Sequence, residues 1–359
     1  MIRIDELLYE KQLKDKKAYL ENLLSPYNAP SLGIYESPIQ NFRMRAEFRI
    51  WHEYENIHYA MFSKNNKTPI FLEDFPYASV TINQLMKNLK KIWQIHPLLK
   101  DKLFQVEFLT TLSNESLVTL CYHKKLDEEW LSLAKLVANQ LKTKIIGRSR
   151  KQKLMTHNNF VQEKLTILGR NYYYIQPENS FSQPNAIVNQ KMITWACEHL
   201  NDYEYDLLEM YCGNGNFTIP FSRYVNRVFT TEISKLSIKA LERNLQLNDI
   251  DNIQLARLSA LELTQAINEI RTFRRLAHID LKSYSFKTIF VDPPRAGLDS
   301  NTCHLISQFP NIIYISCNPE TLAKNLEYLT KTHRITASAL FDQFPYSSHI
   351  ETGIVLSKK

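Results

Sequence analysis

At 359 residues, with 44% hydrophobic and 23% charged residues, the chain has a globular composition and is long enough for two domains. The densely charged first twenty residues and the lack of a long apolar run predict neither a signal peptide nor a membrane-spanning helix. The five cysteines never occur in CxxC spacing, which argues against a disulfide framework, a zinc ribbon or an iron–sulfur cluster and fits a reducing cytoplasm.

The positive charge is confined to the first half of the chain. Residues 1–176 hold 26 Lys and Arg against 18 Asp and Glu, whereas the remainder holds 18 against 19. A basic half joined to a neutral half indicates a module that binds a polyanion, and we favour nucleic acid. Solvated surface lysines are the alternative, but they explain the amount of charge and not its asymmetry.

Two segments near the start of the chain have clear patterns. Residues 4–24 carry leucines at near-helical spacing among charged residues, so we expect a helix there. The segment 41–52 alternates, with Arg43, Arg45 and Arg49 between apolar residues, as in a strand. Arginine binds phosphate in a bidentate manner and aromatic rings stack on unpaired bases, so this strand is a candidate RNA contact. A half-buried strand with solvated arginines explains the local pattern equally well.

The rest of the first half mixes helices and strands. We predict helices at 82–93 and 127–141, paired strands at 102–111 and 115–123, and a basic cluster at 145–153. The sequence therefore predicts a basic α+β RNA-recognition region. We expect it to span residues 1–176, with residues 1–25 as a helix able to pack on the other domain, and residues 177–359 to form a second domain.

From residue 177 the pattern changes to alternating strands and helices. Helical segments separate the first five strands, which is typical of a parallel, doubly wound, Rossmann-like α/β sheet. No helix fits between the last two, so they should form an antiparallel hairpin. A seven-stranded parallel sheet closed by such a hairpin is the outline of a class I methyltransferase rather than of a dehydrogenase. The predicted strands are 206–211, 227–232, 253–258, 286–291, 311–316, 335–341 and 350–356.

A glycine turn follows the first of these strands. Gly213 and Gly215 permit a tight turn and a close approach of backbone to ligand, but Thr218 stands where a dinucleotide site has its third glycine. Glu232 ends the next strand, 17 residues beyond Gly215, where it can accept hydrogen bonds from a ribose diol. Together these features favour S-adenosylmethionine over NAD as the cofactor.

Three further strand ends carry reactive side chains. Asp292 is followed by two prolines and Arg295, where amino-group methyltransferases place an aromatic residue, so amine methylation is disfavoured. Asp292 could also be a helix or turn cap. Cys317 follows the strand 311–316 and is either an apolar filler or a nucleophile. Glu351, in His-Ile-Glu, belongs to the final hairpin.

A thiol, a carboxylate and a methyl donor together suit the methylation of carbon 5 of uracil. This carbon is a poor nucleophile, but thiolate addition at carbon 6 turns it into an enolate carbon that can attack a methyl group. A base then removes the carbon-5 proton and the thiol is expelled. Cys121, Cys197, Cys212 and Cys303 are expected to be packing residues.

Several motifs resemble those of the tRNA (uracil-5-)-methyltransferases. In the second half they are QPN (183–185), MYCGNGNFT, VDPPRAGLD, YISCNPETLAKNLEYL and FDQFPYSSHIETG. In the first half they are SPIQNFRMRAEFRIWH, KLFQVEFLTTLSN and YHKKLDEEW, so the resemblance covers nearly the whole chain. It implies that Cys317 is the nucleophile and that Glu351 is the base. No metal site is expected, in line with the scattered cysteines. The resemblance also implies S-adenosyl-L-methionine binding at Gln183, Tyr211, Asn216, Glu232 and Asp292.

The resemblance further implies that the product is ribothymidine at position 54 in the T loop of tRNA. Family relatives that act on ribosomal RNA usually carry an N-terminal RNA-binding barrel and a four-cysteine iron–sulfur site. We expect neither feature in this sequence, which favours tRNA as the substrate. Ribosomal or another T-arm-like RNA is the alternative substrate, and a non-catalytic tRNA-folding chaperone is the alternative function. No obligate protein partner is evident. RNA contacts are expected at Arg49, Phe104, His123, Phe181 and Arg295, although core packing would also explain Phe104.

Overall fold

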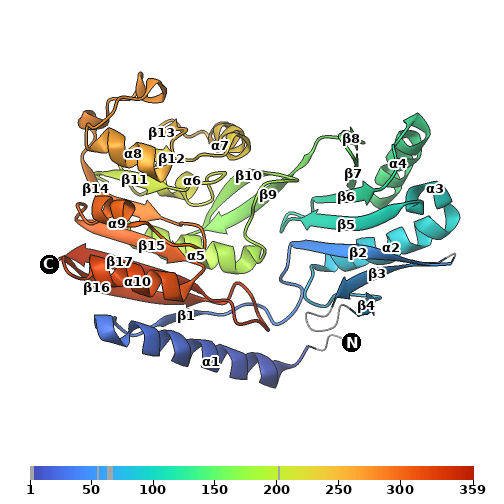
Figure 1. The fold of residues 1–359 in the computed structure, drawn as a ribbon, viewed down its shortest axis with the longest axis horizontal. Helices are drawn as coiled ribbons and strands as arrows, with labels where there is room; N and C mark the ends of the chain where they lie inside the picture. Colours follow the sequence, from blue (N-terminus) through green and yellow to red (C-terminus); the bar gives the residue numbers. More distant parts are fainter. Residues whose placement is uncertain (1–3, 55, 63–67, 201–202) are drawn as a thin grey trace. The chain divides into compact units, whose positions relative to one another are not determined.

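The computed structural model describes residues 4–54, 56–62, 68–200 and 203–359, and Figure 1 shows its ribbon. The chain forms two compact units. Unit 1 contains Pro38–Lys164 and Gln176–Ala186 together with the first residues of the chain, and unit 2 contains Glu6–Ser37, Leu165–Ile175 and Ile187–Lys359. This division differs from a boundary after residue 176, because three short segments fold with parts of the chain that are distant in sequence.

Unit 1 is built on a seven-stranded sheet. The strand order is β4-β3-β2-β5-β6-β7-β8, and all neighbours are antiparallel except β6 and β7. The predicted strands around 41–52, 102–111 and 115–123 are thereby confirmed. The strands are β2 (Arg45–Glu53), β3 (Asn56–Phe62), β4 (Pro69–Leu72), β5 (Leu103–Thr110), β6 (Ser116–Tyr122), β7 (Lys144–Ser149) and β8 (Gln152–Met155).

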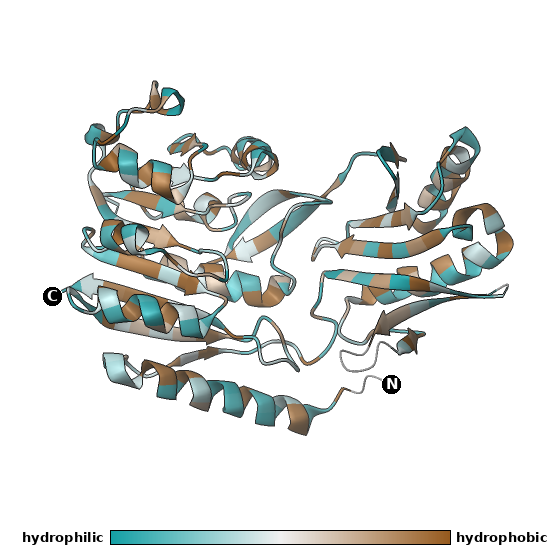
Figure 2. Ribbon diagram, in the orientation of Figure 1, coloured by the Kyte–Doolittle hydropathy of each residue, from teal (hydrophilic) through white to brown (hydrophobic). Residues whose placement is uncertain are grey.

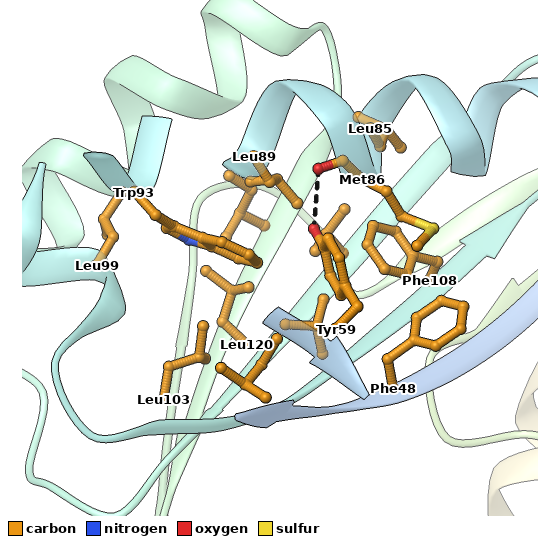
Figure 3. Packing of buried hydrophobic residues seen from close by; sticks show 14 of the residues in the cluster. Phe48, Tyr59, Leu85, Met86, Leu89, Trp93, Leu99, Leu103, Phe108 and Leu120 are labelled. Atoms are coloured by element: carbon orange, nitrogen blue, oxygen red, sulfur yellow. Dashed lines mark hydrogen bonds between the residues drawn. The ribbon is translucent and has the colours of Figure 1, made fainter. Parts of the chain in front are cut away.

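Helices cover one face of this sheet and form the core of unit 1 with it. They are α2 (Val80–Ile95), α3 (Pro97–Lys100) and α4 (Glu128–Leu141). Ser79 caps α2 by accepting a hydrogen bond from Ile82 N, and Asp127 caps α4 in the same way. Inside the core, the Tyr59 hydroxyl donates to the carbonyl of Met86 at 3.1 Å, so this buried polar group is satisfied (Figure 3).

The opposite face of the sheet is only partly covered. Leu109, Leu117 and Ile146 pack with Val161 of β9 (Phe160–Ile167) in a small second cluster. Along β2 the apolar residues face the helices, while Arg49 lies on the other, exposed face. The alternation predicted for this segment is therefore confirmed. β9 pairs with β10 (Arg170–Pro177) in a two-stranded sheet, and each of these strands contributes residues to both units.

Unit 2 is built on an eight-stranded sheet, one strand more than the seven predicted. The order is β1-β16-β17-β15-β14-β11-β12-β13, with β17 antiparallel to β15 and β16 and the other neighbours parallel. The extra strand β1 contains three residues from the first part of the chain and pairs with β16. The strands are β1 (Gly33–Tyr35), β11 (Asp206–Met210), β12 (Val228–Thr231), β13 (Ile253–Ala256), β14 (Phe286–Val291), β15 (Asn311–Ser316), β16 (His333–Phe341) and β17 (Glu351–Lys358).

The middle strands of this sheet are buried on both faces, and Figure 2 shows them as mostly hydrophobic. Helix α1 contacts α10, α10 contacts α9, and α9 contacts α8 (Figure 1). The predicted N-terminal helix is therefore part of unit 2. The helices are α1 (Glu6–Leu24), α5 (Ala186–Glu198), α6 (Thr218–Phe221), α7 (Lys235–Leu247), α8 (Ala260–Ile267), α9 (Ser300–Ile306) and α10 (Pro319–Leu329).

Within the described ranges, none of the helices combines the length and the apolar character needed to cross a bilayer.

The core of unit 1 gives a direct test of this packing. Leu89 is fully buried on α2, so Leu89→Ala should lower the free energy of unfolding by about 2–5 kcal/mol through lost burial and a residual cavity. Exposed Leu136 on α4 is the matched control, and Leu136→Ala should change stability by no more than about 0.5 kcal/mol. Urea denaturation followed by tryptophan fluorescence measures both. Equal losses for the two variants would contradict the described core.

Candidate active site

The predicted site residues of unit 2 lie along one edge of its sheet. Parallel strands β11, β12, β14 and β15 all end at this edge, and the antiparallel strand β17 begins there. Open α/β sheets bind ligands at this edge. The residues at the strand ends are, in spatial order, Glu351, Cys317, Asp292, Tyr211 and Glu232.

The register of β15 and β17 brings Cys317 and Glu351 together. Ser316 pairs with Thr352 across the antiparallel ladder, so Cys317, one residue later, faces Glu351, one residue earlier. Glu351 is only 4% exposed, and Cys317 is half-buried. The turn at Cys317 is held by Asn318, whose side chain caps α10 by accepting from Glu320 N at 3.2 Å.

Burial governs the ionisation of this group of side chains. It raises the pKa of Cys317 to about 11, with further contributions from the charges of Glu351 and Asp292, while Arg295 lowers it. Burial also raises the pKa of Glu351 well above its usual range and that of Asp292 to about 7. Burial therefore shifts all three of these acidic side chains toward their neutral forms.

A cavity of about 790 Å³ opens onto Cys317. Exposed Arg295 lies on its wall, and its Nη2 atom is 3.3 Å from Nδ1 of His349. Arg295 is therefore the cation in this cavity that favours the ionised forms of both Cys317 and Glu351. The walls of this cavity are formed by residues of α1, by Cys317–Glu320 and by residues 346–350.

A second, smaller cavity of about 170 Å³ lies where β11 and β12 end. Glu232 Oε2 accepts a hydrogen bond from Gly213 N at 3.0 Å, which ties the glycine turn to the next strand end. Gly213 and Gly215 both have positive φ, and a Cβ added at Gly213 would point into open space, whereas one at Gly215 would collide with Leu241. Glu232, the glycine turn and the apolar lining of this cavity fit the ribose and base of an adenosine. The cavity is lined by Met210, Tyr211, Thr231, Glu232, Ile233, Leu258, Ser259 and Ala260.

Two other predicted cofactor residues have distinct surroundings. The side-chain amide of Asn216 exchanges two hydrogen bonds with that of Asn189, at 2.8 and 2.9 Å, so it orders the end of the glycine turn. Gln183 belongs to unit 1, and among the described residues its buried Oε1 atom has no hydrogen-bond partner. A buried amide oxygen without a partner is a candidate ligand contact.

Three of the predicted RNA-contact residues form one stack in unit 1. The rings of Phe104 and His123 lie 4.0 Å apart with an angle of 13° between their planes. The Arg49 guanidinium lies 5.7 Å from the centre of the Phe104 ring. A bulge in the β5–β6 pairing at Phe104 accompanies this arrangement. Phe104 is partly buried within the stack and is not among the buried residues of the unit 1 core.

The other two RNA-contact residues are separate from this stack. Phe181 belongs to unit 1 and is 74% exposed, and Arg295 belongs to unit 2. Lysines surround the stack in two neighbouring cavities of unit 1. They are Lys100, Lys102, Lys124, Lys125 and Lys151.

Several basic residues of the two segments considered for RNA contact bind other residues of unit 1. Buried Glu178 binds Arg148 at 2.5 and 2.9 Å and Lys153 at 2.8 Å. Burial works against ionisation of Glu178, but these two cations outweigh it and lower its pKa. Arg45 donates to the carbonyls of Glu178 and Ser180, both at 2.8 Å. These contacts hold the segment that carries Phe181 and Gln183 on the sheet of unit 1.

Two buried ionisable side chains near the site were not predicted from the sequence. Glu209 of β11 is buried, and burial raises its pKa to about 8. Lys16 of α1 is also buried and lines the Cys317 cavity. The sequence does carry a signal for Lys16, because it stands in the apolar stripe of α1 with Leu13, Leu20 and Leu24.

The sheet closed by an antiparallel hairpin, the glycine turn and the acid on the next strand define an S-adenosylmethionine-dependent methyltransferase. A family model described as tRNA (Uracil-5-)-methyltransferase matches residues 8–359. The chain belongs to the tRNA (uracil-5-)-methyltransferase family.

Curated relatives agree with this assignment, and a solved structure shares the fold. A tRNA/tmRNA (uracil-C(5))-methyltransferase of Pseudomonas fluorescens (strain Pf-5) is 54% identical over 356 residues, covering 99% of each chain. One of the same description from Pseudomonas aeruginosa (strain PAO1) is 53% identical over 360 residues, again covering 99% of each. The structure of Pyrococcus abyssi tRNA (uracil-54, C5)-methyltransferase with S-adenosyl-L-homocysteine shares the fold, with a TM-score of 0.74 and 21% identity over 97% of this chain and 83% of that one.

The raised pKa of Cys317 predicts how fast an alkylating agent reacts with its thiol. Alkylation by iodoacetamide should be slow at neutral pH and rise toward pH 11, because only the thiolate reacts. Asp292→Asn removes a negative charge that raises the pKa, so it should speed the reaction at pH 8–9, whereas Arg295→Met should slow it. Peptide mass spectrometry gives the rate at Cys317.

Asp15 provides the control for this experiment, because it lines the same cavity, whereas the charges that shift the pKa of Cys317 belong to Glu351, Asp292 and Arg295. Asp15→Asn should leave the pH profile unchanged. The described electrostatics are wrong if Asp292→Asn and Asp15→Asn behave alike.

Proposed function

We propose that this protein methylates carbon 5 of uridine 54 in the T loop of tRNA, with Cys317 as the nucleophile and Glu351 as the base. The observation that carries the proposal is the β15–β17 register, in which Cys317 faces Glu351 at the sheet edge where Asp292, Tyr211 and Glu232 also lie. Relatives at 54% identity are named as acting on tRNA and tmRNA, so tmRNA is a second candidate substrate.

S-adenosylmethionine supplies an electrophilic methyl group. Glu232 and the Gly213 turn would hold its adenosine in the 170 Å³ cavity, with Tyr211 on the wall. Asp292 lies between this cavity and Cys317 along the sheet edge. Asn216 completes the proposed set within unit 2, and Gln183 of unit 1 is proposed from the family resemblance alone.

Cys317 adds its sulfur to carbon 6 of the uracil, and the ring becomes nucleophilic at carbon 5. Arg295 favours the thiolate that this step needs, since its charge lowers the pKa of Cys317. After carbon 5 has gained the methyl group, the Glu351 carboxylate takes the carbon-5 proton and the carbon–sulfur bond breaks. A carboxylate whose pKa is raised by burial holds that proton strongly, which suits a base.

RNA recognition is proposed for the Arg49–Phe104–His123 stack and the lysines near it. Exposed aromatic rings bind unpaired bases such as those of a loop, and lysines and arginines neutralise phosphates. Phe181 is exposed enough to stack on a base removed from the loop. This division gives unit 1 the role of binding the RNA.

The two proposed catalytic residues should fail at different steps. Cys317→Ala should abolish methylation and any RNA adduct that survives denaturation, while S-adenosylmethionine binding persists. Glu351→Gln should transfer the methyl group but retain the product as a covalent protein–RNA complex, because elimination needs a base. With methyl-labelled cofactor, a denaturing gel should show label at the position of the complex only for Glu351→Gln.

Controls for this pair are available in the same chain. Cys197→Ala, in α5, and Glu320→Gln, on the cavity wall, should retain turnover. A tRNA with cytidine at position 54 should accept no label. Normal turnover by Cys317→Ala, or slow turnover without trapped label in Glu351→Gln, refutes the corresponding role.

The stack in unit 1 should determine tRNA affinity. Phe104→Ala should weaken tRNA binding by about 5- to 100-fold, since stacking on one base is worth about 1–3 kcal/mol. Arg49→Ala should also weaken it and reduce the dependence of log K on log salt by about one phosphate contact. Trp51→Ala is the control, because Trp51 is an exposed aromatic of the same strand outside the stack. Filter binding at several salt concentrations measures the tRNA affinity of all three variants. Affinities of Phe104→Ala and Arg49→Ala equal to that of the wild type would show that these residues do not contact the RNA.

A further inference from the structure

Helix α1 carries a lysine on its buried face. Leu13, Lys16, Leu20 and Leu24 follow one another at helical spacing, and Lys16 is only 4% exposed. An ammonium group in such a stripe is costly unless a buried partner binds it. A lysine retained at this position therefore points to a specific contact.

Two acceptors bind Lys16, the buried Asp342 and the partly buried carbonyl of Phe344, and both belong to the loop between β16 and β17. Its Nζ atom lies 2.7 Å from Oδ1 of Asp342, which is fully buried, and 3.0 Å from the carbonyl of Phe344. Asp342 is fixed in turn, because its N–H donates to the carbonyl of Tyr35 at 3.0 Å. Lys16 thus anchors the first part of the loop.

A second contact of α1 holds the middle of the same loop. Gln12, one turn before Lys16, accepts a hydrogen bond from Tyr346 N at 2.7 Å through Oε1. The rings of Tyr9 and Tyr346 lie 5.9 Å apart. The loop continues through His349 directly into Glu351, so α1 determines where the chain approaches the sheet edge.

The same helix also contacts the element that follows Cys317. The Tyr19 hydroxyl donates to Oε1 of Glu320 at 3.4 Å, and the hydroxyl of Tyr27, just after α1, donates to the carbonyl of Ala323 at 2.9 Å. Both acceptors belong to α10, which starts two residues after Cys317. Between these two sets of contacts, α1 forms a wall of the Cys317 cavity.

We infer that Lys16 is a positioning residue for the methylation reaction. By binding Asp342 and Phe344, Lys16 fixes the position of the loop that leads through His349 to Glu351. It thereby fixes the position of the proposed base relative to Cys317. This inference rests on the proposed roles of Cys317 and Glu351. It assigns to the N-terminal helix a part in the chemistry rather than in RNA binding.

Lys16→Met tests the inference, because it keeps the length of the side chain and removes the charge that binds Asp342. We expect kcat per cofactor-binding site to fall about 10- to 100-fold, as for a small displacement of a reacting group, with the KM for tRNA changed by less than about threefold. Methyl-labelled covalent complex should accumulate, because a displaced Glu351 removes the carbon-5 proton slowly. Lys16→Arg, which keeps a cation, should restore part of kcat.

Lys17→Met is the matched control. Lys17 is the next residue, is 46% exposed and is paired with Glu21 at 3.8 Å, so its loss should leave kcat and the labelled complex unchanged. If Lys16→Met fails to fold, Gln12→Ala provides the test. It removes the hydrogen bond from Tyr346 N to the same helix without leaving a buried charge unpaired. It should lower kcat a few-fold and also increase the labelled complex.

A purely structural role for Lys16 predicts a lower melting temperature with kcat per cofactor-binding site and labelled complex at wild-type levels. That result, or wild-type behaviour of Gln12→Ala where Lys16→Met does not fold, overturns the inference. Cys317→Ala and Glu351→Gln, measured in parallel, separate the two proposals. If these behave as expected and Lys16→Met does not, only the role of Lys16 fails.

Discussion

The antiparallel pairing of β15 with β17 is the constraint on which the candidate site depends. Side chains alternate between the faces of a sheet, so a slip of one residue in this ladder would send Glu351 to the other face and away from Cys317. Buried neighbours fix the register. A Cβ at Gly353 in β17 would collide with the rings of Trp195 and Phe341, so the strand fits at only one position. The final hairpin lies inside the sheet, between β1 and β15, and therefore supports the candidate site.

The same burial that fixes the geometry sets the chemical state of the site. Cys317, Glu351 and Asp292 are too poorly solvated to carry three negative charges together, and each pKa is raised accordingly. Arg295 is the cation that opposes this effect at Cys317 and Glu351. A thiol whose pKa is raised in this way reacts slowly with alkylating agents and oxidants, because the thiolate is the reactive form.

Much of this organisation could be predicted from the sequence, because it depends on local patterns. The strands, the glycine turn and the strand-end positions of Asp292 and Cys317 follow from periodicity and from the rule that parallel strands end at one edge. Contacts between residues distant in sequence could not be predicted in this way. The three-residue strand β1 has too short a pattern to detect, the partner of Lys16 lies in the last hairpin, and Arg45 and Arg148 resemble RNA contacts until Glu178 and its neighbours are seen to bind them.

The segment 176–186 folds with unit 1, although it precedes the main body of unit 2 in the chain. Glu178, Arg148 and Arg45 hold it there, and it carries both Phe181 and Gln183. A chimera that received unit 1 from a relative would therefore receive these two residues as well. An exchange with its boundary after residue 176 would instead separate most of this segment from Arg45 and Arg148, which bind it.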